Sequence, residues 1–353
     1  MNLLNGVLIL IIQKITIDHM KVSAIASVLL FCFIGCSDDE PDMEPAPQIT
    51  NIHVAGSETI GTKHILTYWK NGVSVSWSAE NASSEDIAIS GEDVYITGYQ
   101  SNGSNNVAKV WKNGVSQDLS DGTIDTYPSA IFVAGSDVYV AGYVKSTPQT
   151  AVYWKNGVMT ELTDGDNPAF ATDILVSGSD VYVSGHERNG DIYVAKIWKN
   201  GIATNLSDGT LSSNANGMMT SGNDFYAVGY EYNGSNLVVK YWKNGIATTL
   251  TDGTNSSNGT SIGVSGNDIY VAGYENIDGS NRARYWKNGE IVILSHLISA
   301  ATGLVIDGED VYVVGWVNTG SKGVATFWKN GEEVTLAKDA SISTTATSIA
   351  ITH

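Results

Sequence analysis

Positively charged side chains are scarce in this sequence of 353 residues. Lysine and arginine together number 19 against 37 aspartates and glutamates, so the formal net charge at pH 7 is −18. Binding to nucleic acid depends on a basic surface that neutralises phosphates. The composition therefore argues against a nucleic-acid partner, and a hydrophobic content of 42% is too high for a wholly disordered chain.

Cysteine is rarer still. The whole chain has two cysteines, Cys32 and Cys36. Both precede residue 49, where a series of repeats begins. A domain formed by the later residues can therefore contain neither a disulfide nor a cysteine-based metal site.

Signatures of catalysis are also lacking. The five histidines after Cys36 occupy no repeated position and show no HExxH spacing. Neither a Gly-x-Ser-x-Gly elbow nor a phosphate-cradling loop occurs in the sequence. We therefore expect a protein that is not an enzyme, although pairs of carboxylates could act as acid and base, as they do in glycosidases.

The first residues have the layout of a bacterial secretory signal. In residues 20–36, MKVSAIASVLLFCFIGC, a lysine is followed by an apolar run and then by small residues. The stretch Phe33-Ile34-Gly35-Cys36 resembles a lipobox, which implies a signal peptide over residues 1–35 and a lipid on Cys36. Met20 is the candidate true start. The alternative is a plain membrane anchor, but the apolar run is shorter than the about 20 residues that a membrane span needs.

Residues 36–48 are predicted to form a lipidated acidic tether. The segment after the cysteine, SDDEPDMEPAPQ, is acidic, rich in proline and poor in large apolar residues. Its beginning, Ser37 to Glu40, resembles the acidic surface-export tag of lipoproteins in some Gram-negative bacteria. The resemblance implies a protein held in the outer membrane by its lipid, at the cell surface or on the periplasmic side.

The tetrapeptide Trp-Lys-Asn-Gly recurs from residue 49 onward. It occurs seven times, at intervals of 42 to 44 residues, and its tryptophans are Trp69, Trp111, Trp154, Trp198, Trp242, Trp286 and Trp328. A period of 40 to 50 residues with strand-like content is typical of a β-propeller.

Each unit contains four short strand patterns. In one unit they are residues 172–177, 180–185, 192–199 and 202–206, and Asn200-Gly201 between the last two suits a type I′ hairpin turn. Four antiparallel strands make one propeller blade. The sequence therefore predicts an all-β, seven-bladed β-propeller over residues 49–353.

The ends of the repeat region predict how the ring closes. Residues 49–56 align with the second strand of a blade, and residues 347–352 align with an innermost strand. If the C-terminal strand pairs with the N-terminal blade, the ring is closed and both exposed edges are removed. The alternative is an open solenoid with two unpaired ends.

The segment Ala151 to Leu162, AVYWKNGVMTEL, resembles the HAF repeats of extracellular bacterial proteins. The likeness covers about 12 residues of each unit. The resemblance implies an extracellular propeller and supplies no site residues.

The repeated tryptophans have two interpretations, ligand stacking and structure. Blades pack face to face, so a tryptophan at one place in every blade is what packing between blades requires. We therefore predict a structural role for all seven.

Differences between the units predict where binding occurs. The Gly-x-Asp and Asn-Gly turns on one face are uniform, whereas the connections on the other face differ in length and chemistry. Binding residues usually lie on variable loops of a rigid scaffold. The candidate ligand-binding residues on this variable face are aromatic residues at the ends of the second strands: Tyr99, Tyr143, His186, Tyr230, Tyr274 and Trp316. The alternative is ordinary packing at the blade edge.

An acidic set on the same face is a candidate Ca²⁺ site. Its members are Asp86, Asp121, Asp164, Asp166, Asp173, Asp208 and Asp252, with Asp164 and Asp166 as the candidate ligands. Calcium prefers several carboxylate and carbonyl oxygens, but no stretch has EF-hand spacing. The alternative is that Asp-Gly simply forms turns.

These observations leave three hypotheses for function. The first is a monomeric, surface-anchored binding module that holds a glycan, a peptide or an envelope protein, with the membrane as a further partner through the lipid. The second is a polysaccharide hydrolase or lyase that uses carboxylates at the channel mouth, such as Asp86 and Asp173. The third is a structural spacer in an envelope complex.

Overall fold

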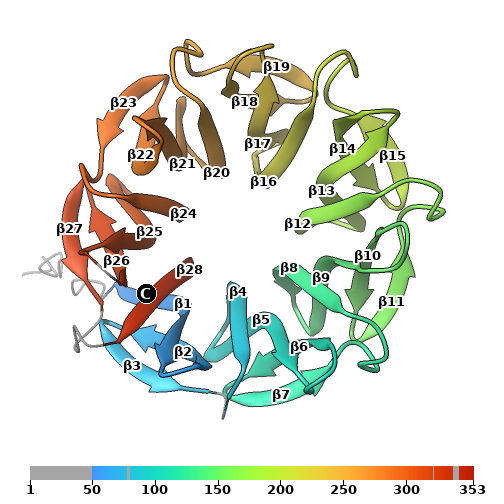
Figure 1. Ribbon diagram of the computed structural model, residues 1–353, viewed down its shortest axis with the longest axis vertical. Coiled ribbons are helices and arrows are strands. Elements are labelled where there is room, and N and C mark those ends of the chain that lie inside the picture. The colour runs from blue at the N-terminus through green and yellow to red at the C-terminus, as the bar shows by residue number, and fades with distance from the viewer. Residues whose placement is uncertain (1–49, 78–79, 321, 337–341) are drawn as a thin grey trace, which may run out of the picture. The chain divides into compact units, whose positions relative to one another are not determined.

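The computed structural model of the chain describes residues 50–77, 80–320, 322–336 and 342–353. These residues form 28 strands and no helix, arranged as seven four-stranded antiparallel sheets around a central axis (Figure 1). The seven-bladed β-propeller that the repeat predicts is therefore confirmed. The predicted signal peptide and lipidated tether, residues 1–35 and 36–48, lie outside the described residues.

The blades follow one another along the chain, and only the first combines strands from both ends. Blade 1 contains β28 (Ser343–Thr352), β1 (Asn51–Ile60), β2 (Lys63–Lys70) and β3 (Val73–Ser76). Blades 2 and 3 contain β4 (Ala82–Ser90), β5 (Asp93–Ser101), β6 (Asn106–Lys112), β7 (Val115–Asp118), β8 (Thr126–Ala134), β9 (Asp137–Val144), β10 (Thr150–Lys155) and β11 (Val158–Glu161). Blades 4 and 5 contain β12 (Ala169–Ser177), β13 (Asp180–Asn189), β14 (Ile192–Lys199), β15 (Ile202–Asn205), β16 (Ser213–Ser221), β17 (Asp224–Tyr232), β18 (Leu237–Lys243) and β19 (Ile246–Thr249). Blades 6 and 7 contain β20 (Ser257–Ser265), β21 (Asp268–Ile277), β22 (Ser280–Lys287), β23 (Glu290–Ile293), β24 (Ser299–Asp307), β25 (Asp310–Asn318), β26 (Gly323–Lys329) and β27 (Glu332–Thr335).

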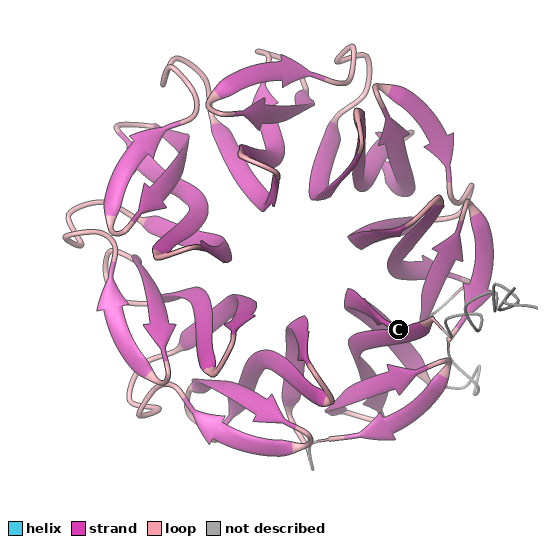
Figure 2. Ribbon diagram, turned by 180° about the vertical axis from the view of Figure 1, so that it is seen from behind, coloured by secondary structure: helices cyan, strands magenta, loops and turns pink. Residues whose placement is uncertain are grey.

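Figure 2 shows the same ring from behind, with strands joined by short loops throughout. The described part of the chain has no helix that is long and apolar enough to span a membrane.

The ring closes by pairing the two ends of the repeat region. β28 lies antiparallel to β1, with Val54 opposite Ile349, and its C-terminal end lies beside β1 in Figure 1. The imidazole Nε2 of His53 and the hydroxyl of Thr352 add a contact of 3.0 Å across this seam. The predicted closure is confirmed and the open solenoid is excluded.

The seven repeated tryptophans are buried between blades, each no more than 2% exposed. Trp154 of blade 3, for example, packs against Tyr95 and Val110 of blade 2, and Trp198 of blade 4 packs against blade 3. Burial of a large aromatic side chain is among the strongest contributions to a core. This burial closes the indoles to ligands and is what a structural role requires.

The uniform turns are held together by one repeated set of side-chain contacts. In blade 2 the carboxylate of Asp93 accepts a hydrogen bond from Asn113 Nδ2 at 2.7 Å and forms an ion pair with Lys112, also at 2.7 Å. The ammonium of Lys112 lies 5.1 Å from the centre of the Tyr95 ring, and Asn113 adopts a φ of 50°. This aspartate joins two neighbouring hairpins, because Asn-Gly and Gly-x-Asp lie side by side on one face.

Candidate functional site

Each innermost strand carries a β-bulge at its middle. In blade 2 the pairing of β4 with β5 shifts between Ser84 and Asp86, which leaves Glu85 without a partner residue. The second strand has glycine at this point, and a Cβ on Gly98 would lie 1.9 Å from the carbonyl oxygen of Ser83. A bulge re-aims its extra side chain. The extra residues of the seven blades are all polar: Glu85, Ser129, Thr172, Asn216, Thr260, Thr302 and Thr347.

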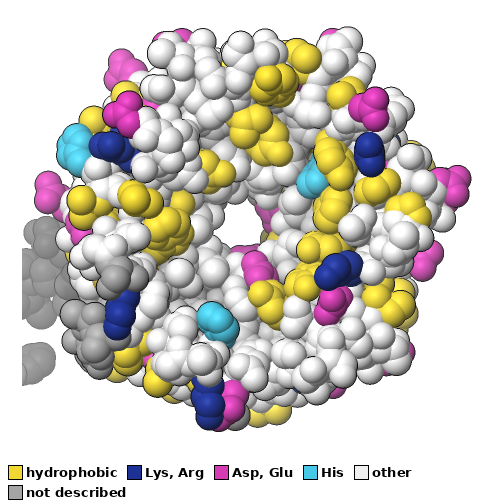
Figure 3. All heavy atoms as spheres, viewed as in Figure 1, with side chains coloured by type: hydrophobic (Ala, Val, Ile, Leu, Met, Phe, Trp, Pro, Cys, Tyr) yellow, Lys and Arg dark blue, Asp and Glu magenta, His cyan; other side chains and the backbone are white. Residues whose placement is uncertain are grey.

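The bulges line a narrow central channel of about 160 Å³. Figure 3 shows the opening, with acidic side chains at its wall and hydrophobic side chains gathered around it. Several hydroxyls bridge adjacent blades here: Thr260 Oγ1 donates to the carbonyl of Ala301, and Thr302 Oγ1 donates to that of Ala346, both at 3.0 Å. The channel wall is therefore a hydrogen-bonded seam between blades.

Asp86 and Asp173 follow the bulges of blades 2 and 4 and join each blade to the next. Asp86 accepts backbone N–H bonds of 2.8 Å from Ile87 and Ile131 and a 2.6 Å bond from the hydroxyl of Ser348. Asp173 accepts 2.7 Å bonds from the backbone N–H groups of Ile174 and Met218. Both carboxylates thus act as cross-links between strands of different blades.

The carboxyl groups of the channel hold their protons unusually strongly. Burial raises the pKa of Asp173 to about 8, and the nearby charge of Asp86 adds to the effect. Burial and Asp86 likewise raise the pKa of Glu85 to about 7. Burial also raises the pKa of Asp86 itself, against the opposing effect of its three hydrogen bonds. Charged carboxylates in a confined channel repel one another and lack water, so the neutral forms are favoured.

Around the mouth of the channel the aromatic side chains of blades 2 to 4 form a continuous arc. Neighbouring ring centres lie 4.8 to 5.2 Å apart along the arc, which alternates between stacked and edge contacts. The members of this aromatic arc are, in order, Tyr99, Tyr127, Tyr143, Phe170, His186 and Tyr193. Such contacts fix half-buried rings in place and leave their outer edges available.

Three of the six aromatic residues proposed from the sequence belong to the arc: Tyr99, Tyr143 and His186. Burial lowers the pKa of His186 to about 4, so its ring is neutral, and Nδ1 lies 2.7 Å from Asn214 Oδ1. Tyr230 and Tyr274 lie opposite asparagines, and the Tyr274 hydroxyl accepts a 3.1 Å bond from Asn258. Trp316 lies opposite Ala300, so its cross-strand partner is not aromatic.

Tyr127 and Phe170 were missed by the sequence analysis, although they bridge the predicted residues. Each lies on an innermost strand, directly opposite Tyr143 or His186 on the second strand. Aligning the innermost strands of the seven repeats places them at the position of Ser83, Asn214, Asn258, Ala300 and Thr345. That alignment was the signal that could have found them.

The arc ends beside a mouth pocket of about 520 Å³ between blades 1 and 2. Blade 1 has Ser57 opposite Thr345, whereas blade 2 has Tyr99 opposite Ser83 and blades 3 and 4 have aromatic pairs, so the space of the ring that Ser57 lacks stays open. Hydroxyl and amide groups line most of it, and Tyr99 forms an aromatic wall. Its lining residues are Ser57, Thr59, His64, Asn81, Ala82, Ser83, Tyr99, Ser101, Asn106 and Thr345.

The acidic residues proposed as a Ca²⁺ site are divided by the structure into two places. Asp86 and Asp173 lie in the channel, whereas Asp121, Asp164, Asp208 and Asp252 lie on exposed loops and bond the backbone N–H two residues on. Asp164 Oδ1 accepts such a bond of 3.1 Å from Asp166. Within residues 50–353, gaps excepted, no group of three or more His, Cys, Asp or Glu side chains is arranged to hold a metal ion.

Solved structures with a similar fold include two from archaeal peptidases. Acylaminoacyl peptidase of Pyrococcus horikoshii matches over 84% of this chain and 52% of its own length, with 13% identity and a TM-score of 0.53. This chain thus spans about half the length of that peptidase. The β-propeller domain of the Trilobed protease from Pyrococcus furiosus matches over 81% and 94%, with 14% identity and a TM-score of 0.52.

The second of these propellers is described as having an open velcro topology, whereas here β28 closes the ring on β1. No protein-family model and no curated protein matches the sequence. At these identities the likeness establishes the β-propeller fold alone.

Proposed function

We propose that the protein is a surface-anchored binding module that holds a neutral glycan in the mouth pocket beside Tyr99. The observation that carries this proposal is the junction of a hydroxyl- and amide-lined pocket with a continuous arc of aromatic rings. A sugar ring has apolar C–H faces that stack on aromatic side chains and a rim of hydroxyls that hydrogen-bond to polar ones. The pocket has the size of a typical small-ligand site.

The electrostatics favour an uncharged sugar over an acidic one. The residues that line the mouth pocket include no aspartate, glutamate, lysine or arginine. A chain with a net charge of −18 repels polyanions at a distance. We therefore expect neutral oligosaccharides to bind more tightly than uronic-acid or sulfated ones.

The proposal includes an anchor to the outer membrane through a lipid on Cys36, with residues 37–48 as the tether. It rests on the lipobox-like sequence and on the acidic stretch that follows it. It also accords with the likeness of residues 151–162 to HAF repeats of extracellular proteins. Metabolic labelling with a fatty-acid analogue tests it: the wild-type protein is expected to be labelled and Cys36→Ala to remain unlabelled, and equal labelling contradicts it.

The hydrolase alternative receives less support from the channel. The Asp86 and Asp173 carboxylates already accept backbone N–H bonds on both oxygens, so they act as cross-links between blades. A general acid or base needs an oxygen that reaches the substrate.

A glycan array followed by calorimetry tests the glycan proposal. We expect the mature domain to retain neutral oligosaccharides and Tyr99→Ala to weaken the best of them at least tenfold. The matched control is Tyr232→Ala, which removes an exposed tyrosine at the end of the second strand of blade 5, on the same face. Equal affinity of wild type and Tyr99→Ala would contradict the site.

A peptide is the second candidate ligand, because both similar propellers belong to peptidases. A random-peptide array under the same conditions distinguishes the two classes. If the protein retains peptides and no glycan, a peptide becomes the ligand of the mouth pocket and the glycan proposal is contradicted. Retention of neither would favour a structural spacer.

A further inference from the structure

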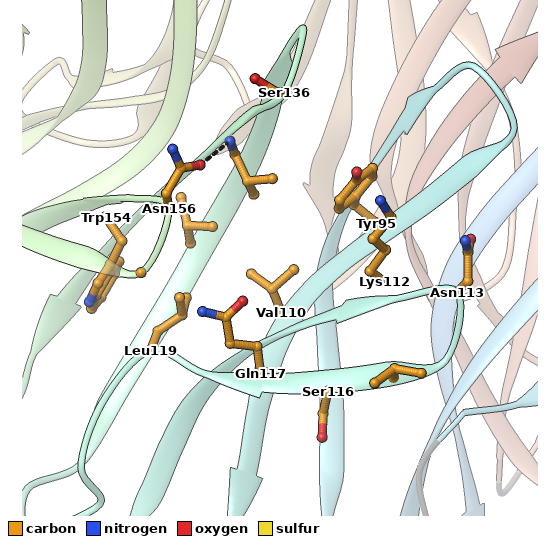
Figure 4. A pocket seen from close by; sticks show the side chains of 14 residues that line it. Tyr95, Val110, Lys112, Asn113, Ser116, Gln117, Leu119, Ser136, Trp154 and Asn156 are labelled. Atoms are coloured by element: carbon orange, nitrogen blue, oxygen red, sulfur yellow. Dashed lines mark hydrogen bonds between the residues drawn. The ribbon is translucent and has the colours of Figure 1, made fainter.

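A second pocket of about 570 Å³ lies between blades 2 and 3, on the side of the uniform turns (Figure 4). We call it the inter-blade pocket. Its apolar wall is formed by Val110 and Leu119 of blade 2 and by Val138, Val140 and Trp154 of blade 3. It is separate from the mouth pocket, because none of its lining residues is shared with that site.

The inter-blade pocket exists because an aromatic ring is missing from the repeat. The residue before the repeated tryptophan packs toward the tryptophan of the following blade, as Tyr241 does with Trp286. In five blades this residue is aromatic: Tyr68, Tyr153, Tyr241, Tyr285 and Phe327. In blade 2 it is Val110, which lies against Trp154 and is smaller by a whole ring.

Blade 4 has a similar loss, but there the facing blade compensates for it. Ile197 stands at the aromatic position, and Phe225 of blade 5 supplies a ring that stacks on Tyr182 with centres 5.6 Å apart. The residues equivalent to Phe225 and Tyr182 at the boundary of blades 2 and 3 are Val138 and Tyr95. Neither blade therefore supplies the ring at this boundary, and the space stays open.

Polar groups lie at the edge of this apolar space. Figure 4 shows the Gln117 side chain beside Val110 and Leu119. Its amide has no hydrogen bond to any other described residue, whereas Lys112 is paired with Asp93 and Asn156 with Asp137. At the same position most blades carry threonine or valine, so a longer, free amide is particular to this boundary.

We propose that the inter-blade pocket binds a small aromatic molecule with a polar substituent. The ring takes the place of the missing tyrosine or phenylalanine, against Trp154, Val110 and Val138. The substituent accepts or donates a hydrogen bond at the Gln117 amide. The volume lies within the range of about 300–1,000 Å³ that is usual for small-molecule sites.

Titration with p-cresol, followed through methyl NMR signals, tests this proposal. We expect the methyl groups of Val110, Val138 and Leu119 to shift in the wild-type protein. 4-Methylcyclohexanol, which has the same substituents on a puckered ring, is expected to bind at least tenfold more weakly. Absence of any p-cresol shifts, or shifts confined to other methyl groups, would overturn the proposal.

Two variants fill the pocket with residues that the repeat already uses elsewhere. Val138→Phe copies Phe225 and Val110→Phe copies Phe327, so each introduces a side chain that this fold accommodates in another blade. Both are expected to abolish p-cresol binding while leaving glycan binding unchanged. The matched control Val158→Ser alters the residue of blade 3 equivalent to Val115, an exposed side chain that does not line the pocket, and is expected to bind normally. A folded Val138→Phe protein that binds p-cresol like the wild type would refute the site.

Discussion

The carboxylate of Asp86 accepts a 2.8 Å hydrogen bond from the backbone N–H of Ile131, which belongs to the next blade. The same relationship joins Asp173 to Met218 at 2.7 Å and Ser261 to Leu304 at 3.2 Å. These contacts place the acceptor in blades 2, 4 and 6, whereas blades 3, 5 and 7 have Ala130, Gly217 and Gly303 at that position. The side-chain acceptors of this one contact thus lie in alternate blades from blade 2 to blade 6.

Asp86→Ala is expected to destabilise the propeller strongly. It leaves two backbone N–H groups and the Ser348 hydroxyl without their acceptor, and each buried group left unpaired costs about 1–3 kcal/mol. Urea unfolding followed by circular dichroism measures the loss. Ser261→Ala, which removes one acceptor only, is the control with a smaller expected effect. Equal midpoints for Asp86→Ala and wild type would contradict the cross-link.

Stability is expected to fall as the pH rises from about 5 to 8. The pKa of Asp173 is about 8 in the folded protein, against about 3.9 for an unfolded chain, so folding takes up a proton in this window. The stability that the protonated Asp173 contributes is fully present below the pKa of the unfolded chain. It is lost as the pH rises through the pKa of about 8 in the folded protein. Denaturation at pH 5, 6, 7 and 8 measures the slope, and Asp173→Asn should reduce it.

The control for this slope is Asp208→Asn. Hydrogen bonds from Thr210 lower the pKa of Asp208 on its exposed loop, so its removal should leave the decline between pH 5 and 8 in place. Glu85, whose pKa is about 7, accounts for the part of the slope that survives in Asp173→Asn. A stability that rises with pH over this range would show that the channel carboxyls are ionised in the folded state.

Truncation of a repeated tryptophan is expected to be among the most damaging single changes. Trp198→Ala removes a fully buried indole between blades 3 and 4, and such losses cost about 3–5 kcal/mol. Trp198→Phe should cost less, since the indole N–H has no hydrogen-bond partner among the described residues. Thermal unfolding compares the two variants. Equal destabilisation of the two variants would contradict the expectation that a phenylalanine ring retains part of the packing between the blades.

Completing the aromatic arc is expected to block the mouth pocket. Ser57 of blade 1 occupies the position that Tyr99 holds in blade 2, so Ser57→Tyr places a ring where the pocket is now open. We expect a folded protein with at least tenfold weaker glycan affinity by calorimetry. Thr249→Tyr, on the outermost strand of blade 5, is the control for adding a tyrosine at an exposed place. Unchanged affinity in Ser57→Tyr would place the ligand elsewhere.

The architecture could be predicted from the sequence because one local pattern recurs seven times. The spacing of Trp69 and its equivalents sets the number of blades, and Asn-Gly marks the hairpin between the third and fourth strands. The tryptophans follow simple rules of burial, and the partial strands at the two ends fix the closure. These features depend on residues close together in the chain.

The site was harder to predict because it depends on side chains that meet across blades. Tyr127 and Phe170 gain their role only where they bridge Tyr99, Tyr143 and His186. Both pockets arise from what one blade lacks, an aromatic side chain at Ser57 in blade 1 and an aromatic ring at Val110 in blade 2. Asp86 and Asp173 were grouped with loop aspartates because the bulges that they follow have no sequence signature of their own.

A crystal structure of the mature domain with the tightest neutral oligosaccharide from the array tests the central proposal most directly. The account predicts a sugar ring against Tyr99, with its hydroxyls bonded to polar groups of the mouth pocket such as Ser57, Asn106 and Thr345. Electron density for the sugar on the face of the uniform turns, or at the outer strands of the blades, would contradict it.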